Sequence, residues 1–109
     1  MKINPETLSW EAPAKNVDGT PIQYELNYEV GISKNGEYKP LVVIAAQLTE
    51  NDGEYEAPIT QLNLEKGEHT IALRSFAKDN PDRKSQWSGP VSFVLSDEIP
   101  QSPLGVRVF

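Results

Sequence analysis

The chain has 109 residues, of which 16 are acidic and 10 are basic, giving a net charge of −6, and it contains no cysteine. This length suits one domain with its own hydrophobic core. The acidic balance argues against nucleic acid and an anionic membrane surface as partners. The lack of cysteine excludes disulfides, thiolate metal sites and a thiol nucleophile. The chain shows neither the apolar stretch of a signal peptide nor a membrane-spanning run, so we expect synthesis and assembly in a cytosol.

The apolar residues follow a period of two, which predicts strands and gives no sign of a long helix. A short strand over residues 8–10 places Leu8 and Trp10 on one face. A longer strand over residues 22–32 has apolar even positions and polar odd ones, so the even positions are expected to face the core.

Turn residues separate the next elements. The Asn-Gly pair at 35–36 tolerates positive φ and predicts a type I′ hairpin turn into a strand over residues 38–46. A short strand over residues 55–59 contains Pro58, which suits the edge of a sheet.

Three further segments complete the pattern. We expect a strand over residues 69–77, a long polar loop over residues 78–86 and a strand over residues 90–96. Roughly seven short strands in a chain of this length indicate an all-β fold, an antiparallel sandwich of two sheets.

Three stretches resemble, in order and spacing, a fibronectin type III domain, a member of the immunoglobulin-like sandwiches. They are LSWEAP, DGTPI and YELNY (within 8–28), LEKGEHTIALRSFA (64–77) and SQWSGPVSFVL (85–95). The likeness covers roughly residues 7–96. It implies that Trp10 lies in the core, that residues 64–77 hold the corner between strands E and F and then strand F, and that strand G follows.

The resemblance has two departures. The family's corner tyrosine is replaced by His69 or Thr70. Too few residues precede the strand at Leu8 for a full strand A, whereas the closing sequence IPQSPLGVRVF has the pattern of such a strand. We therefore divide the chain into a sandwich over residues 1–96 that lacks a full strand A, and a proline-containing tail over residues 97–109 with a strand A-like segment.

Four placements of the tail are open. It could return as strand A of its own domain, although residues 96–102 span at most about 25 Å and a strand of nine residues is roughly 30 Å long. It could pair antiparallel with strand G, or complete a neighbouring subunit by β-augmentation. It could also be the start of a following module. We favour the neighbour, with a subunit interface formed by Leu104, Val106, Arg107, Val108 and Phe109.

Other candidate sites are weaker. Trp87 either caps one end of the sandwich or lies exposed at the base of the polar loop, and with Asn80, Asp82 and Arg83 it forms a candidate binding loop. His69 is the only histidine, and we expect it to be structural.

The remaining polar residues include one candidate metal site. The alternating carboxylates Asp52, Glu54 and Glu56 could bind calcium, although a solvated acidic edge is the simpler interpretation. No sequence motif supports catalysis, so we expect no enzyme and no cofactor.

These features favour a non-enzymatic structural subunit of a larger assembly that binds copies of itself or other subunits. A bacteriophage virion protein, such as a capsid decoration, neck or tail component assembled in the host cytoplasm, fits best. The alternative is an adhesion or spacer module of an extracellular bacterial surface protein or polysaccharide-degrading enzyme, with carbohydrate as a candidate ligand.

Overall fold

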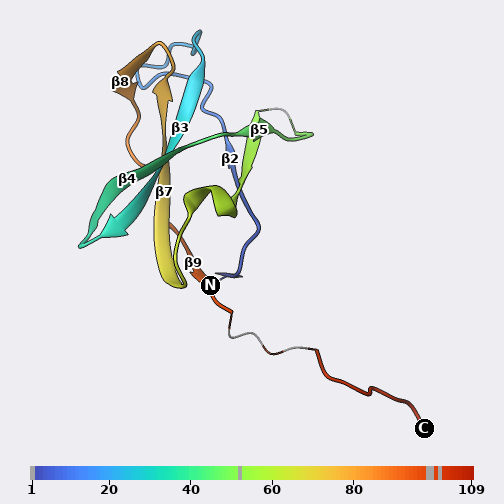
Figure 1. Cartoon of the computed structure of the whole chain (residues 1–109). Helices are drawn as coiled ribbons and strands as arrows, with labels where there is room; N and C mark the ends of the chain where they lie inside the picture. Colours follow the sequence, from blue (N-terminus) through green and yellow to red (C-terminus); the bar gives the residue numbers. More distant parts are fainter. Residues whose placement is uncertain (1, 52, 98–99, 101) are drawn as a thin grey trace.

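The computed structural model describes residues 2–51, 53–97, 100 and 102–109 (Figure 1). Within these residues the fold is all-β, with nine strands, one 3₁₀ turn and no α-helix. The described residues accordingly contain no candidate membrane-spanning helix. The prediction of an all-β chain is confirmed, while the expected number of about seven strands is not.

The strands form two sheets. The six-stranded sheet has the order β1-β9-β7-β3-β4, with β8 also paired to β7. The three-stranded sheet has the order β2-β6-β5. All described pairs are antiparallel except β1 with β9. The bounds are β1 (Lys2–Ile3), β2 (Thr7–Glu11), β3 (Leu26–Lys34), β4 (Glu37–Ile44), β5 (Gln47–Leu48), β6 (Glu54–Pro58), the 3₁₀ turn η1 (Ile59–Leu62), β7 (Gly67–Ala77), β8 (Asn80–Lys84) and β9 (Val91–Leu95).

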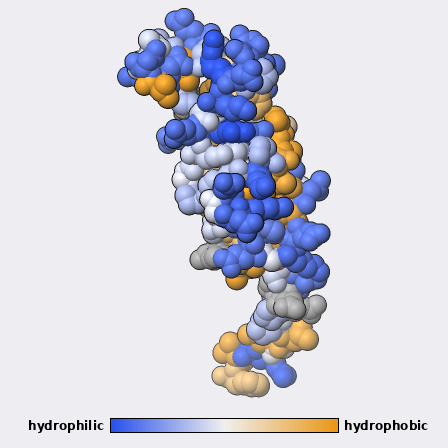
Figure 2. Space-filling view, turned by 90° about the vertical axis from the view of Figure 1, so that its left-hand side faces the viewer, coloured by the Kyte–Doolittle hydropathy of each residue, from blue (hydrophilic) through white to orange (hydrophobic). Residues whose placement is uncertain are grey.

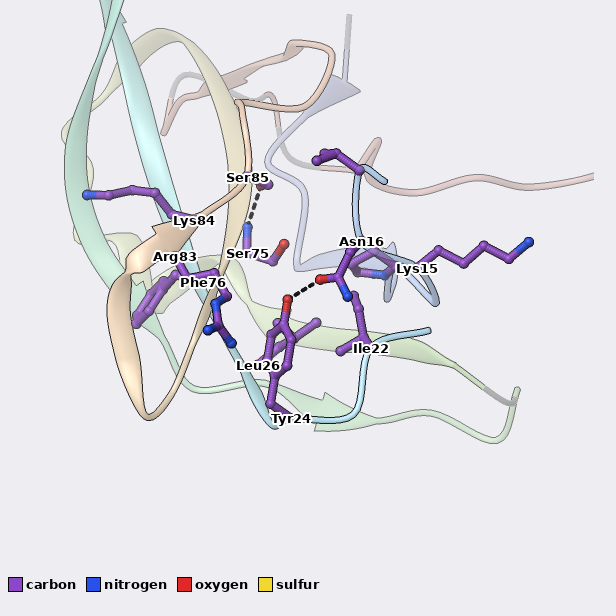
Figure 3. A pocket seen from close by; sticks show the side chains of 12 residues that line it. Lys15, Asn16, Ile22, Tyr24, Leu26, Ser75, Phe76, Arg83, Lys84 and Ser85 are labelled. Carbon is purple, nitrogen blue, oxygen red and sulfur yellow. Dashed lines mark hydrogen bonds between the residues drawn. The ribbon is translucent and has the colours of Figure 1, made fainter. Parts of the chain in front are cut away.

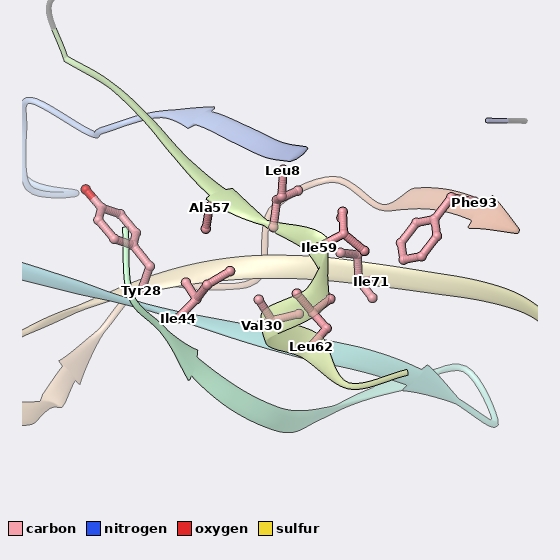
Figure 4. Close-up of a cluster of buried hydrophobic side chains, with 9 residues drawn as sticks. All are labelled: Leu8, Tyr28, Val30, Ile44, Ala57, Ile59, Leu62, Ile71 and Phe93. Atoms are coloured by element: carbon pink, nitrogen blue, oxygen red, sulfur yellow. The ribbon is translucent and has the colours of Figure 1, made fainter. Parts of the chain in front are cut away.

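The hydrophobic core lies between the two sheets (Figure 4). Its largest fully buried side chains are those of Phe93, Ile71 and Val30. The full cluster is Leu8, Tyr28, Val30, Ile44, Ala57, Ile59, Leu62, Ile71 and Phe93. Because both sheets contribute one apolar face to it, the arrangement is compatible with a sandwich.

The hairpin between β3 and β4 forms where the sequence predicts it. Asn35 and Gly36 both have positive φ, 54° and 81°, as a type I′ turn requires. Residues Lys34 and Glu37 are paired on either side of it. The predicted turn is therefore confirmed.

The long strand expected over residues 22–32 is shifted toward the C-terminus and begins only at Leu26. The preceding residues bond elsewhere, because the Ile22 amide donates to the Ala14 carbonyl at 3.1 Å and the Lys78 amide donates to the Glu25 carbonyl at 2.9 Å. Within the observed strand the predicted inward face is correct at Tyr28 and Val30, which are buried.

Two further expectations are wrong. Residues 78–86 are not one long loop, since β8 pairs with β7 through Ala77–Asn80 and Phe76–Lys84. The strand containing Pro58 is not an edge strand, since β6 lies between β2 and β5. Pro58 is tolerated because it is the last residue of β6, beyond the two residues that pair with β5.

The N-terminal residues join the larger sheet. Lys2 and Ile3 pair in parallel with Phe93 and Val94. The Asn4 side chain then clamps the end of β9: its Nδ2 donates to the Ser96 carbonyl at 2.7 Å, and its Oδ1 accepts from the Ser96 amide at 2.9 Å. The segment before β2 is therefore paired with the edge of β9.

Candidate interaction site

The predicted contact residues of the tail all lie in solvent. Leu104, Val106, Val108 and Phe109 have relative exposures of 93%, 82%, 97% and 108%. The tail leads away from the two sheets in Figure 1, and Figure 2 shows it as a projection rich in hydrophobic surface. The guanidinium carbon of Arg107 lies 5.8 Å from the centroid of the Phe109 ring. These four apolar side chains are thus uncovered.

Residues 102–109 form no strand in this single chain. They pair neither with β2 nor with β9, so neither of the two intrachain placements is present. Ile99 and Gln101, which belong to the predicted tail segment, lie outside the described residues. The predicted interface residues therefore lie together on one unpaired segment.

The candidate binding loop is not one site. Asn80, Asp82 and Arg83 lie on the exposed strand β8, and the guanidinium carbon of Arg83 lies 5.0 Å from the centroid of the Tyr24 ring. Trp87 contacts a different set of residues, described below. The strand formed by residues 80–84 explains the separation, because it holds Arg83 beside the loop that precedes β3.

Arg83 and Tyr24 help to line a shallow pocket at this end of the molecule (Figure 3). The Tyr24 hydroxyl donates a hydrogen bond to Oδ1 of Asn16. Leu26 and Phe76 contribute apolar surface. Lys15 and Lys84 also line this pocket, and the ends of their long side chains point away from it in Figure 3.

Trp87 covers the outer face of the six-stranded sheet. A Cβ atom at Gly31 would lie 2.6 Å from the far edge of its indole. The guanidinium carbon of Arg74 lies 4.1 Å from the ring centroid, and the Tyr38 ring lies at 5.9 Å. Arg74 also forms an ion pair with Glu29 at 2.6 Å. Trp87 is therefore half-buried, matching neither of the two predicted positions.

The identity of the residues that contact Trp87 was not predictable from sequence patterns. Gly31 and Arg74 belong to neighbouring strands of the larger sheet, and only the pairing of β3 with β7 brings them together. A glycine in a strand interior does indicate a close approach by another group, and at Gly31 that group is the indole.

His69 has a structural contact. Its Nε2 lies 2.6 Å from the Glu65 carbonyl, and its ring lies 5.9 Å from that of Phe93. The neighbouring Thr70 hydroxyl lies 2.7 Å from that of Ser92. These contacts hold the start of β7 against the turn before it and against β9.

The acidic residues of β6 face outward. Glu54 and Glu56 alternate with Tyr55, and Oε2 of Glu54 accepts a hydrogen bond from Asn51 at 2.9 Å. Asp52, the third candidate calcium ligand, lies outside the described residues. Among the residues that the structure describes, no group of three or more histidine or carboxylate side chains could hold a metal ion.

Trp10 has the predicted core position. Its ring lies 5.1 Å from that of Tyr28 in an edge-on arrangement and 6.4 Å from that of Tyr55 in a stacked one. The pKa of the Tyr28 hydroxyl is raised above its ordinary value, mainly because the group is buried and to a smaller extent because Tyr55 lies beside it. This aromatic cluster closes one end of the core between β2, β3 and β6.

No protein-family model matches the chain, and no curated protein matches it.

Proposed function

We propose that the chain is a fibronectin type III-like module of the immunoglobulin-like class. In such sandwiches one sheet has the order A-B-E-D and the other contains strands C, F and G. The observed order β2-β6-β5 corresponds to B-E-D, and β4-β3-β7-β9 corresponds to C′-C-F-G. The position of strand A beside β2 has no occupant among the described residues.

The corner before β7 also supports this assignment. In the immunoglobulin class a tyrosine hydroxyl ties this corner to the backbone a few residues upstream. Here the His69 imidazole is within hydrogen-bond distance of the Glu65 carbonyl, four residues earlier. Histidine thus takes the place of tyrosine at the corner.

The role that we propose is that of a non-enzymatic structural subunit, which joins a larger assembly by donating its tail as a strand. The observation that carries this proposal is the exposure of Leu104, Val106 and Val108 at alternate positions of an unpaired segment. Burying an aliphatic side chain stabilises by roughly 1.5–3 kcal/mol. The segment therefore gains from docking on a sheet edge, where alternate side chains enter one core.

The assembly that we propose is a virion, with the chain as a capsid decoration, neck or tail component. The support is an analogy: small sandwich subunits with exchanged strands suit repetitive particles built from many copies. A carbohydrate-binding adhesion or spacer module has less support. Arg74 lies against the Trp87 ring and Gly31 lies against its edge, which leaves little of the indole for stacking on a sugar.

The test is sedimentation velocity of the full-length chain across a range of concentrations. We expect the wild-type chain to associate and the variant carrying Val106→Asp and Val108→Asp to stay monomeric, because the charged side chains cannot enter a core. The matched control is Val17→Asp, which changes an equally exposed valine in a loop. Association of the tail variant at wild-type strength would refute the role of the tail.

A further inference from the structure

We propose that the acceptor of the tail is the free edge of strand β2 in a second copy of this chain. This proposal rests on the proposed function, because it names the surface that the donated strand occupies. It places residues 104–109 of one subunit antiparallel to β2 of the next, in the position of the absent strand A.

The hydrogen bonds of β2 identify the free backbone groups. On the side facing β6, the Glu6 carbonyl accepts from the Ile59 amide at 2.9 Å and the Ala12 amide donates to the Gly53 carbonyl at 2.7 Å. Backbone groups of alternate residues point to opposite sides of a strand. The amides and carbonyls of Thr7, Ser9 and Glu11 therefore face away from β6, where no strand of the described chain pairs with them.

A groove opens beside the C-terminal end of β2. Residues that line it include Trp10 and Glu11 of β2, Tyr28 of β3, Leu73 of β7, and Ser85, Gln86 and Ser88. No residue of β6 lines it, which places the groove on the free side of the strand. A strand laid against β2 would cover the core where it is now open.

The tail matches this edge in length and pattern. Six residues, 104–109, can pair with residues 7–12, so that Val106 lies opposite Trp10 and Val108 opposite Leu8, both facing the core. Arg107 then lies opposite Ser9 on the outer face. Gly105 has a φ of 65° in the single chain and must become extended on docking, a change that glycine makes at little steric cost.

The charges are complementary. Arg107 is the only ionisable side chain in the sequence SPLGVRVF. On the outer face of the acceptor sheet Ser9 pairs with Glu56 and Glu11 pairs with Glu54. Arg107 would thus join a face that carries the carboxylates of Glu11, Glu54 and Glu56. Without it, these like charges repel one another across the paired strands.

The other long edge of the molecule is less suitable. Strand β4 contains Pro40, which lacks an amide hydrogen, and Lys39 beside it. Proline and lysine at an edge both discourage the addition of a strand. Lysine would also repel Arg107. We therefore assign the tail to β2.

The experiment pairs two full-length variants that each lose one half of the contact. Ser9→Pro removes the free amide hydrogen of the acceptor edge without removing a hydrogen bond to β6. Val106→Asp with Val108→Asp removes the donor. Ser9→Ala is the matched control, because the Ser9 side chain is exposed and its backbone amide is retained.

We expect each variant alone to sediment as a monomer, and their mixture to form a one-to-one complex that grows no further. Ser9→Ala should associate like the wild type, and Ser9→Pro should weaken self-association by more than about tenfold. If the circular dichroism of the Ser9→Pro chain is not native, the charge reversal Arg107→Glu takes its place. This reversal should weaken association, and the double change Glu11→Arg with Glu56→Arg should restore it.

The outcomes separate the two proposals. If Ser9→Pro, or the charge reversal, associates as strongly as the wild type while the tail variant stays monomeric, the β2 acceptor is wrong and the donated tail stands. If the tail variant also associates normally, both proposals fail. If Ser9→Pro and the tail variant, each monomeric alone, do not combine on mixing, docking between copies is excluded.

Discussion

At the scale of single residues, the outer face of the larger sheet depends on a close fit between Trp87 and Gly31. A side chain at position 31 would meet the indole at 2.6 Å. The indole itself is held by Arg74, which is fixed in turn by its ion pair with Glu29. The absence of a Cβ atom on β3 is therefore what allows a tryptophan to cover the sheet.

We predict that Gly31→Ala destabilises the domain by about 1–3 kcal/mol, because overpacking forces the indole or the strand to move. Urea unfolding followed by circular dichroism measures this change. The control is Gly89→Ala, since a Cβ atom there meets nothing within 4 Å. In the Trp87→Ala background the cost of Gly31→Ala should shrink. Equal costs in both backgrounds would show that the indole contact is not the cause.

A second prediction concerns alkaline pH and the Tyr28 hydroxyl, whose pKa is raised by burial. Since the folded state holds this proton more tightly than the unfolded state, the associated stability is fully present below about pH 10 and is lost as the pH rises further. Tyr28→Phe should therefore have a smaller loss of unfolding free energy between pH 9 and 11. Identical pH profiles for the two chains would contradict the assignment.

At the scale of elements, the sequence predicts those features of the fold that depend only on residues close together in the chain. The turn at Asn35 and Gly36 was predictable because its positive φ angles are a property of the residues themselves. The inward positions Tyr28 and Val30 follow from the period of two. Strand β8 was missed because its residues are all exposed, so no apolar alternation marks it and only the pairing with β7 makes it a strand.

The same distinction applies to the candidate sites. The apolar pattern of residues 104–109 predicts a strand-like tail, which stays a prediction because these residues form no strand in the single chain. The groove beside Trp10 and the contact of Trp87 with Arg74 could not be predicted, since each joins residues that are distant in sequence. Pro58 led to the wrong prediction of an edge strand, because the sequence does not show that β5 pairs with β6 only before Pro58.

We predict that Gly36→Ala destabilises the hairpin by about 1–2 kcal/mol, because a φ of 81° is strained for any residue with a Cβ atom. The free energy of unfolding in urea is the measurement. Asn35→Gly, which keeps a residue that accepts positive φ at the neighbouring position, should change stability far less. A Gly36→Ala chain as stable as this control would argue against the type I′ turn.

At the scale of the whole molecule, one chain contains both an uncovered strand edge and an uncovered apolar segment. The end of β9 lies beside Asn4, close to the start of β2, whereas a strand antiparallel to β2 must begin at its far end beside Glu11. To pair with β2 of its own chain, the tail would first have to run back past the whole of that strand, whereas on another copy it can enter the edge directly. Head-to-tail contacts of this kind close into a ring or extend as a string.

Because the chain has no cysteine, introduced cysteines can test the central claim directly. A full-length chain carrying Ser9→Cys is mixed with one carrying Arg107→Cys under oxidising conditions, and the disulfide-linked species are identified by peptide mass. We predict a cross-linked heterodimer joining the two positions, and none when Ser9→Cys is replaced by Lys84→Cys on the exposed strand β8. A heterodimer that forms no more readily through position 9 than through position 84 would contradict the donation of the tail to β2.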